Sequence, residues 1–243
     1  QQATGADGKQ LDSMVSNSGQ INAQGGVVQM TANAARDLVS SVVNVSGVVQ
    51  ASAASIGANG SIVLDGGSGG VQVAGKLDAS GKAAGEGGGK VLVYGEKIDL
   101  TQTAAIDVSG DQGGGTILIG GDYRGQGGAP RALTTNVQSG AVIVADATNT
   151  GDGGKVIVWA DDKTQFDGKI SARGGAVSGA GGLVETSGKS QLTVAGSVDA
   201  GATNGAAGMW LLDPTDIVVA ASGGTVTAAT IQTSLNSGTN VTL

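Results

Sequence analysis

Short apolar segments that open with glycine recur along the whole chain. Each has four residues of strand character after the glycine, and these segments begin at Gly26, Gly60, Gly89, Gly115, Gly154, Gly182 and Gly208. The differences between successive positions are 34, 29, 26, 39, 28 and 26 residues. Within each segment apolar residues alternate with a period of two, which predicts β-strands instead of helices.

A second kind of short segment lies between these strands, at residues 75–81, 105–110, 168–174 and 196–201. Each repeat therefore holds two or three short strands separated by Gly, Ser, Asn and Asp. A propeller blade has a similar length, but its four strands lack a short glycine-led element at this spacing. The pattern predicts an all-β chain, folded as a right-handed parallel β-helix of about 26–39 residues per coil. The two long intervals are expected to hold loops, one of them over residues 124–131.

Alternation also predicts which side chains face the core. The second and fourth residues after each leading glycine are expected inside, as are three alanines of the second segment. They are Val28, Met30, Ile62, Leu64, Val91, Val93, Ile117, Ile119, Val156, Val158, Trp210, Leu212, Ala79, Ala172 and Ala200. Residues 31–43 contain the alanines and leucine of a helix, but their valine-rich end favours a strand.

The third residue after the leading glycine should face outward, yet it is apolar in most repeats. Stacked in register, these residues predict a stripe that is interrupted at Glu185. Its members are Val63, Leu92, Leu118, Ile157 and Leu211, with Tyr94 and Trp159 two residues further along on the same face. An exposed stripe would be a lateral contact surface for another rod, a host ligand or a partner domain. The alternative is that the loops of the longer repeats cover it.

Acidic residues recur at equivalent outward positions of the second segment. Asp78, Asp107 and Asp199 occupy these positions, with Ser171 between the last two. Stacked carboxylates repel each other, so a bridging Ca²⁺ is one hypothesis for this row. The simpler hypothesis is a solvated surface row that Lys76 and Lys169 compensate, with no bound metal.

Composition excludes several classes of function. The chain has no Cys and no His, so disulfides, common zinc sites and histidine-based catalysis are absent. A net charge of −7, with only 13 Lys and Arg, argues against nucleic acid as a partner. No segment reaches the roughly 18 apolar residues of a membrane span. The four arginines, at 36, 124, 131 and 173, are scattered, so we expect neither an enzyme nor a cofactor.

The most specific motif lies near the end of the chain, at Trp210, Leu211, Leu212, Asp213 and Pro214. With residues 153–160, 181–188 and 235–241, it resembles the segment Trp-Leu-Leu-Asp-Pro of filamentous-haemagglutinin-like exoproteins of bacterial two-partner secretion. From the residues alone, the motif is structural: the apolar side chains close a coil, and Pro214 ends strand pairing at Asp213.

The resemblance implies export through an outer-membrane transporter and a secreted, cell-surface location. The Asn-Pro-Asn motifs of that family's secretion domain are absent, because neither Pro130 nor Pro214 follows Asn. We therefore expect residues 1–243 to be one shaft segment, downstream of that domain, truncated at both ends and without caps. The leading hypothesis is the structural shaft of an adhesin that attaches to cells, surfaces or other bacteria, as in biofilms. The alternatives are a carbohydrate-active β-helix enzyme and a filament subunit that associates laterally or head to tail.

Overall fold

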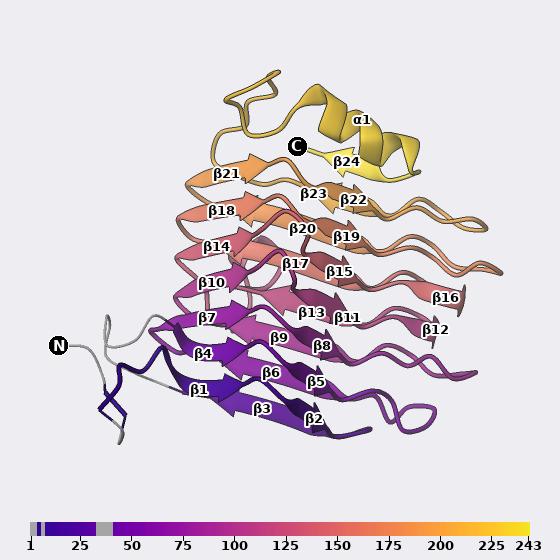
Figure 1. The fold of residues 1–243 in the computed structure, drawn as a ribbon. Coiled ribbons are helices and arrows are strands. Elements are labelled where there is room, and N and C mark those ends of the chain that lie inside the picture. The colour runs from indigo at the N-terminus through magenta and orange to yellow at the C-terminus, as the bar shows by residue number, and fades with distance from the viewer. Residues whose placement is uncertain (1–3, 6–7, 33–40) are drawn as a thin grey trace.

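The chain forms a β-solenoid of three parallel sheets (Figure 1), seen in a computed structural model that describes residues 4–5, 8–32 and 41–243. Each coil up to β23 gives one strand to each sheet, and equivalent strands of successive coils pair in parallel. The prediction of a parallel β-helix is confirmed.

The three sheets run the length of the stack. The first contains β1 (Ser13–Asn17), β4 (Ser41–Val45), β7 (Gly70–Val73), β10 (Lys97–Leu100), β14 (Thr134–Val137), β18 (Lys163–Phe166) and β21 (Gln191–Val194). The second contains β2 (Gln20–Asn22), β5 (Val48–Gln50), β8 (Lys76–Asp78), β11 (Ala105–Asp107), β15 (Val142–Val144), β19 (Lys169–Ser171) and β22 (Ser197–Asp199). The third contains β3 (Val27–Thr31), β6 (Ser61–Asp65), β9 (Lys90–Tyr94), β13 (Thr116–Ile119), β17 (Lys155–Ala160), β20 (Leu183–Gly188), β23 (Met209–Leu211) and β24 (Asn240–Thr242).

The core lies between the sheets and consists of aliphatic side chains from every coil. All the residues predicted to face inward are buried, from Val28 and Met30, which are 7% exposed, to Trp210, which is completely enclosed. A two-residue period fixes these faces because successive side chains of a strand point to opposite sides of the sheet.

Corners of the coil bring backbones too close for any side chain. A Cβ atom placed on Gly60 would lie 1.5 Å from the carbonyl oxygen of Ala51. Close approach of this kind recurs at the glycines that precede the later strands of the third sheet, from Gly89 to Gly208, so no larger residue fits at these corners.

The two long intervals hold inserted segments. In the 39-residue interval, residues 120–133 join β13 to β14 and contain a short 3₁₀ helix, η1 (Tyr123–Gly125). This coil also contains β15, a strand that the sequence pattern missed. In the 34-residue interval β3 ends at Thr31 and β4 begins at Ser41, and the strand expected over residues 31–43 falls largely outside the described residues. A short pair, β12 (Gly110–Gln112) and β16 (Ala147–Thr150), extends from the stack.

One helix, α1 (Ala228–Asn236), lies across the C-terminal end of the stack (Figure 1). The hydroxyl of Thr227 caps it by accepting a hydrogen bond from the backbone N–H of Thr230, and Ile231 packs against the core. The helix was not predicted, and it corrects the expectation of an uncovered stack at this end. Its sequence is rich in Ala, Thr and Ser, so its apolar periodicity is weak. No helix in the described part of the chain has the length and apolarity of a membrane span.

Candidate functional site

Residues 120–131, here called the strap, cross the outer face of the third sheet. Asp122 begins η1 by accepting a hydrogen bond from the backbone N–H of Tyr123, and it also pairs with Lys155 of β17. The backbone N–H of Arg124 donates to the Glu185 carboxylate of β20. Charged contacts therefore hold the strap against two neighbouring coils.

The strap covers most of the predicted apolar stripe. The expected register is confirmed, since Val63, Leu92, Leu118, Ile157, Glu185 and Leu211 are successive partners in the third sheet. However, the prediction of an exposed contact surface is wrong for Leu118, Ile157, Trp159 and Leu211, which are buried.

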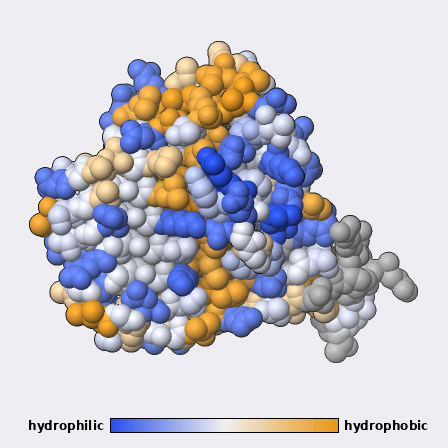
Figure 2. Space-filling view, turned by 180° about the vertical axis from the view of Figure 1, so that it is seen from behind, coloured by the Kyte–Doolittle hydropathy of each residue, from blue (hydrophilic) through white to orange (hydrophobic). Residues whose placement is uncertain are grey.

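The physical reason is a small second core. Leu118, Ile157 and Trp159 pack with Leu92 and Tyr94, which are half-buried, and with Tyr123 of the strap. Val63 is also half-buried. In the rear view of the molecule, hydrophilic side chains interrupt the hydrophobic seam that runs along the stack (Figure 2). The strap thus packs on Leu92, Tyr94, Leu118, Ile157 and Trp159.

Gly125 is a point where the strap lies close against the sheet. Its φ is +62°, and a Cβ atom there would lie 2.4 Å from the ring atom Cζ2 of Trp159. We predict that Gly125→Ala lifts the strap and lowers the free energy of unfolding by about 1–3 kcal/mol. Urea unfolding and acrylamide quenching of tryptophan fluorescence measure the two effects. Gly128→Ala is the matched control, since a Cβ there meets nothing within 4 Å; equal effects of the two substitutions would contradict the prediction.

Glu185 is a buried acid under the strap, with none of its surface exposed. One carboxylate oxygen accepts the hydrogen bond from Arg124 at 2.9 Å, and the other has no hydrogen-bond partner. Burial raises the pKa of Glu185, and Asp213 adds to this effect, while hydrogen bonds from Arg124 and Ser187 oppose it. The sequence showed Glu185 only as an interruption of the stripe.

This raised pKa makes stability depend on pH. Between the unfolded and folded pKa values, the folded chain keeps a proton that the unfolded chain has lost, so stability falls as pH rises through that window. We predict that Glu185→Gln stabilises the protein relative to the original chain more at about pH 8 than at about pH 4. Urea midpoints across this range measure the difference. A stability difference for Glu185→Gln that does not change with pH would refute the assignment.

A polar pocket of about 300 Å³, here called the strap pocket, opens beside the strap. It is lined by Arg124, Gly125, Arg131, Trp159, Asp161, Lys189, Asp213, Pro214 and Thr215. Arg131 pairs with Asp161 at 2.9 Å, and Arg124 lies 3.7 Å from Asp213. The expectation that the arginines are scattered is therefore wrong for two of them. Folding brings them beside Lys189, which is 58 residues or more away in sequence.

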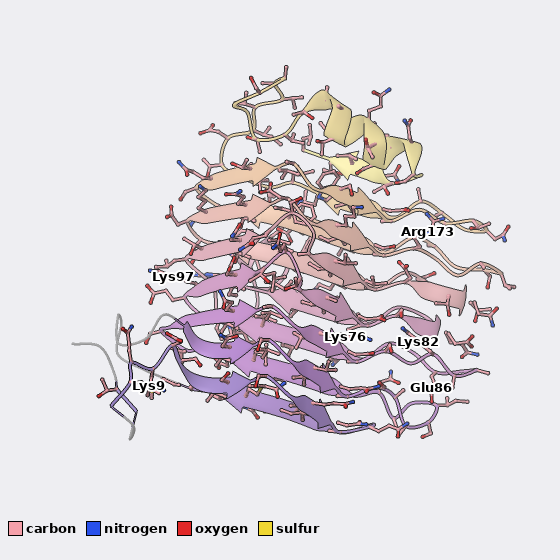
Figure 3. All side chains as sticks on the ribbon, viewed as in Figure 1. Lys9, Lys76, Lys82, Glu86, Lys97 and Arg173 are labelled. Atoms are coloured by element: carbon pink, nitrogen blue, oxygen red, sulfur yellow. The ribbon has the colours of Figure 1, made fainter. Side chains whose placement is uncertain are left out.

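The acids stack at the second sheet as predicted, but Asp78 is buried instead of solvated, and each acid has partners within the protein. Asp78 is paired with Asp107, and Ser171 is paired with Asp199. Val144, which the sequence pattern missed, lies between Asp107 and Ser171. Asp78 pairs with Lys76, Asp107 with Lys82, and Asp199 with Arg173. The three basic residues lie along one side of the stack (Figure 3).

Local hydrogen bonds hold the same acids in place. Asp78 accepts from the backbone N–H and hydroxyl of Ser80, and Asp107 does the same with Ser109. Burial raises the pKa of Asp78, but hydrogen bonds from Lys76 and Ser80 outweigh it and leave the pKa below its usual value. In the described residues no three acidic or other ligating side chains group as a metal site. A calcium ion on this row would have to displace these partners.

The tryptophan motif spans the last coil and the strap pocket. Trp210 and Leu212 are completely buried, and the indole N–H of Trp210 donates to the hydroxyl of Thr186 at 2.9 Å. Strand β23 ends at Leu211, two residues before Asp213. The structural interpretation holds for the apolar residues, whereas Asp213 and Pro214 also line the strap pocket.

The fold and the strap define a parallel β-solenoid with one covered face. No protein-family profile matches the chain, and no curated protein matches it. Among solved structures, it is similar to the crystal structure of the HMW1 secretion domain from Haemophilus influenzae, with 31% sequence identity and a TM-score of 0.65. The match covers 82% of this chain and 49% of that one, so this chain spans about half the length of the structure that it resembles.

Proposed function

We propose that the chain is part of the shaft of a large secreted bacterial surface adhesin, which attaches cells to other cells or to surfaces. The observation that carries the proposal is the likeness, at 31% identity, to a secretion domain. A continuous stack of hydrogen-bonded strands also suits a rod, because each coil is supported by its neighbours. The particular resemblance to filamentous-haemagglutinin-like exoproteins belongs to this proposal.

Comparing cells that display the intact full-length protein with cells whose protein lacks this segment tests the proposal. Surface amounts are matched by immunofluorescence, and attachment is counted on host cells and on abiotic surfaces. We expect attachment to fall severalfold at equal display, because the shaft carries binding regions away from the cell surface. Unchanged attachment at equal display would overturn the proposal.

We further propose that the segment is not an enzyme and needs no cofactor. The acids that could act in catalysis on the second sheet already pair with Lys76, Lys82 and Arg173. The alternative, a carbohydrate-active β-helix, is tested by incubating the chain with acidic and neutral glycans, with and without Ca²⁺. Depolymerisation that Asp107→Ala abolishes would establish the enzyme instead.

A second candidate function has its own support in the comparison. The similar structure is a secretion domain, so part of this chain is a candidate for recognition by an outer-membrane transporter during export. Producing the chain behind a signal peptide, with and without such a transporter, distinguishes a chain that is part of a secretion domain from a segment that lies downstream of one. Export that requires the transporter would place this chain within a secretion domain. Retention in the periplasm would support a segment that lies downstream.

A further inference from the structure

The strap pocket concentrates positive charge on an acidic molecule. The whole chain has a net charge of −7 and only 13 basic residues, yet three of these line this one pocket. Arg124 and Arg131 come from the strap, and Lys189 follows β20. Two acids, Asp161 and Asp213, line it as well, so basic side chains exceed acidic ones. A local excess of this sign attracts anions.

The basic groups are only partly engaged by protein partners. The side chains of Arg124 and Arg131 are 48% and 51% exposed, and the contact of Arg124 with Asp213 is long, at 3.7 Å. Lys189 forms no ion pair with any residue in the described part of the chain. Unused donors therefore face the pocket.

The framework around these groups is well fixed. The indole N–H of Trp159 donates to Asp161 at 3.1 Å, and the hydroxyl of Thr215 donates to the backbone carbonyl of Lys189 at 2.6 Å. Behind the strap, Glu185 holds the backbone of Arg124. With about 300 Å³, the pocket is at the small end of ligand sites, so it fits one compact group of a larger molecule.

The mixture of charges narrows the class of ligand. Guanidinium and ammonium groups form strong charged hydrogen bonds with a carboxylate. Asp161 and Asp213 would repel a bare sulfate or phosphate, but they accept hydrogen bonds from hydroxyl groups. A small ring that carries a carboxylate and hydroxyl groups can both pair with the basic side chains and donate hydrogen bonds to the two aspartates. We propose that the strap pocket binds a single carboxylated sugar residue of an acidic polysaccharide; this inference rests on the proposed adhesin, whose surface meets such polymers.

Titration calorimetry of the purified chain tests the inference. The probes are a trimer of galacturonic acid, the matching neutral trimer of galactose, and inorganic sulfate. We expect saturable binding of the acidic trimer that weakens with salt, and about tenfold weaker binding of the neutral trimer. Lys189→Gln should weaken binding of the acidic trimer about tenfold, whereas Lys90→Gln, an exposed lysine of another coil, should leave it unchanged.

Several outcomes would overturn the inference. They are no saturable binding, equal binding of the two trimers, equal loss in Lys189→Gln and Lys90→Gln, or sulfate that competes as well as the acidic trimer. Circular dichroism verifies folding, and Arg131→Gln replaces Lys189→Gln if the latter does not fold. Because this binding is measured in solution, its failure leaves the attachment experiment to decide on the adhesin separately.

Discussion

A chain that lacks residues 61–89 is expected to fold into a solenoid that is shorter by one coil. Ser61 and Lys90 are register partners in the third sheet, so joining Gly60 to Lys90 brings β9 next to β3. Strands β10 and β11 would then pair with β4 and β5, so every strand inside the three sheets keeps two parallel neighbours. The deletion lies away from the strap, whose contacts with β17 and β20 remain.

The matched control removes only residues 61–75, which is about half a coil. This deletion places β8 where β6 should pair, so each following strand moves to a different sheet and loses its own pairing partners. We expect the whole-coil deletion to be soluble, with a β-sheet circular dichroism spectrum and a proportionally smaller urea m-value. The half-coil deletion should be insoluble or unfolded. Equal behaviour of the two would contradict a coil-by-coil solenoid.

Trp210→Ala should be the most destabilising single substitution near the end of the stack. The side chain is completely buried between β20 and β24, and its removal leaves a large cavity. The hydroxyl of Thr186, which is itself completely buried, loses its donor. We expect the free energy of unfolding to fall by about 3–5 kcal/mol.

Two further substitutions separate the contribution of the indole ring from that of its N–H group and from the effect of changing any side chain of this strand. Trp210→Phe keeps most of the ring but not the N–H group, so its cost should be intermediate, at about 1–3 kcal/mol. Met209→Ala changes a neighbouring side chain that is 38% exposed, and it should cost no more than about 0.5 kcal/mol. Urea unfolding gives all three values. If Trp210→Ala cost no more than Met209→Ala, a packing role for Trp210 would be refuted.

The regular part of the fold was predictable because its signals are local. Alternating residues such as Ile62 and Leu64 identify the inward face of a strand without reference to the rest of the chain. Repetition of the same glycine-led pattern then fixes which strands stack, and the register that aligns Val63 with Leu92 follows from it. Prediction failed where the repeat weakens: β15 has Val144 where the predicted strands of its sheet have Asp or Ser, and α1 has a polar-rich pattern.

The candidate site was only partly predictable, because its contacts join distant segments. The stripe and Glu185 were visible in the sequence, and coverage by loops was one of the two alternatives. Composition did not reveal that Arg124 contacts Glu185, 61 residues away, or that Arg131 contacts Asp161, 30 residues away.

Local sequence patterns were enough to predict the solenoid, coils of two or three strands, the buried faces of those strands and the stacking of the acids. The tertiary structure alone decided that the strap buries Ile157 and Trp159, that Glu185 loses contact with water, and that a charged pocket forms beside it. The physical reason is the range of the interactions. Strand alternation is set by neighbouring residues, whereas burial by an inserted loop depends on where the loop packs, and that depends on the position of every coil beneath it.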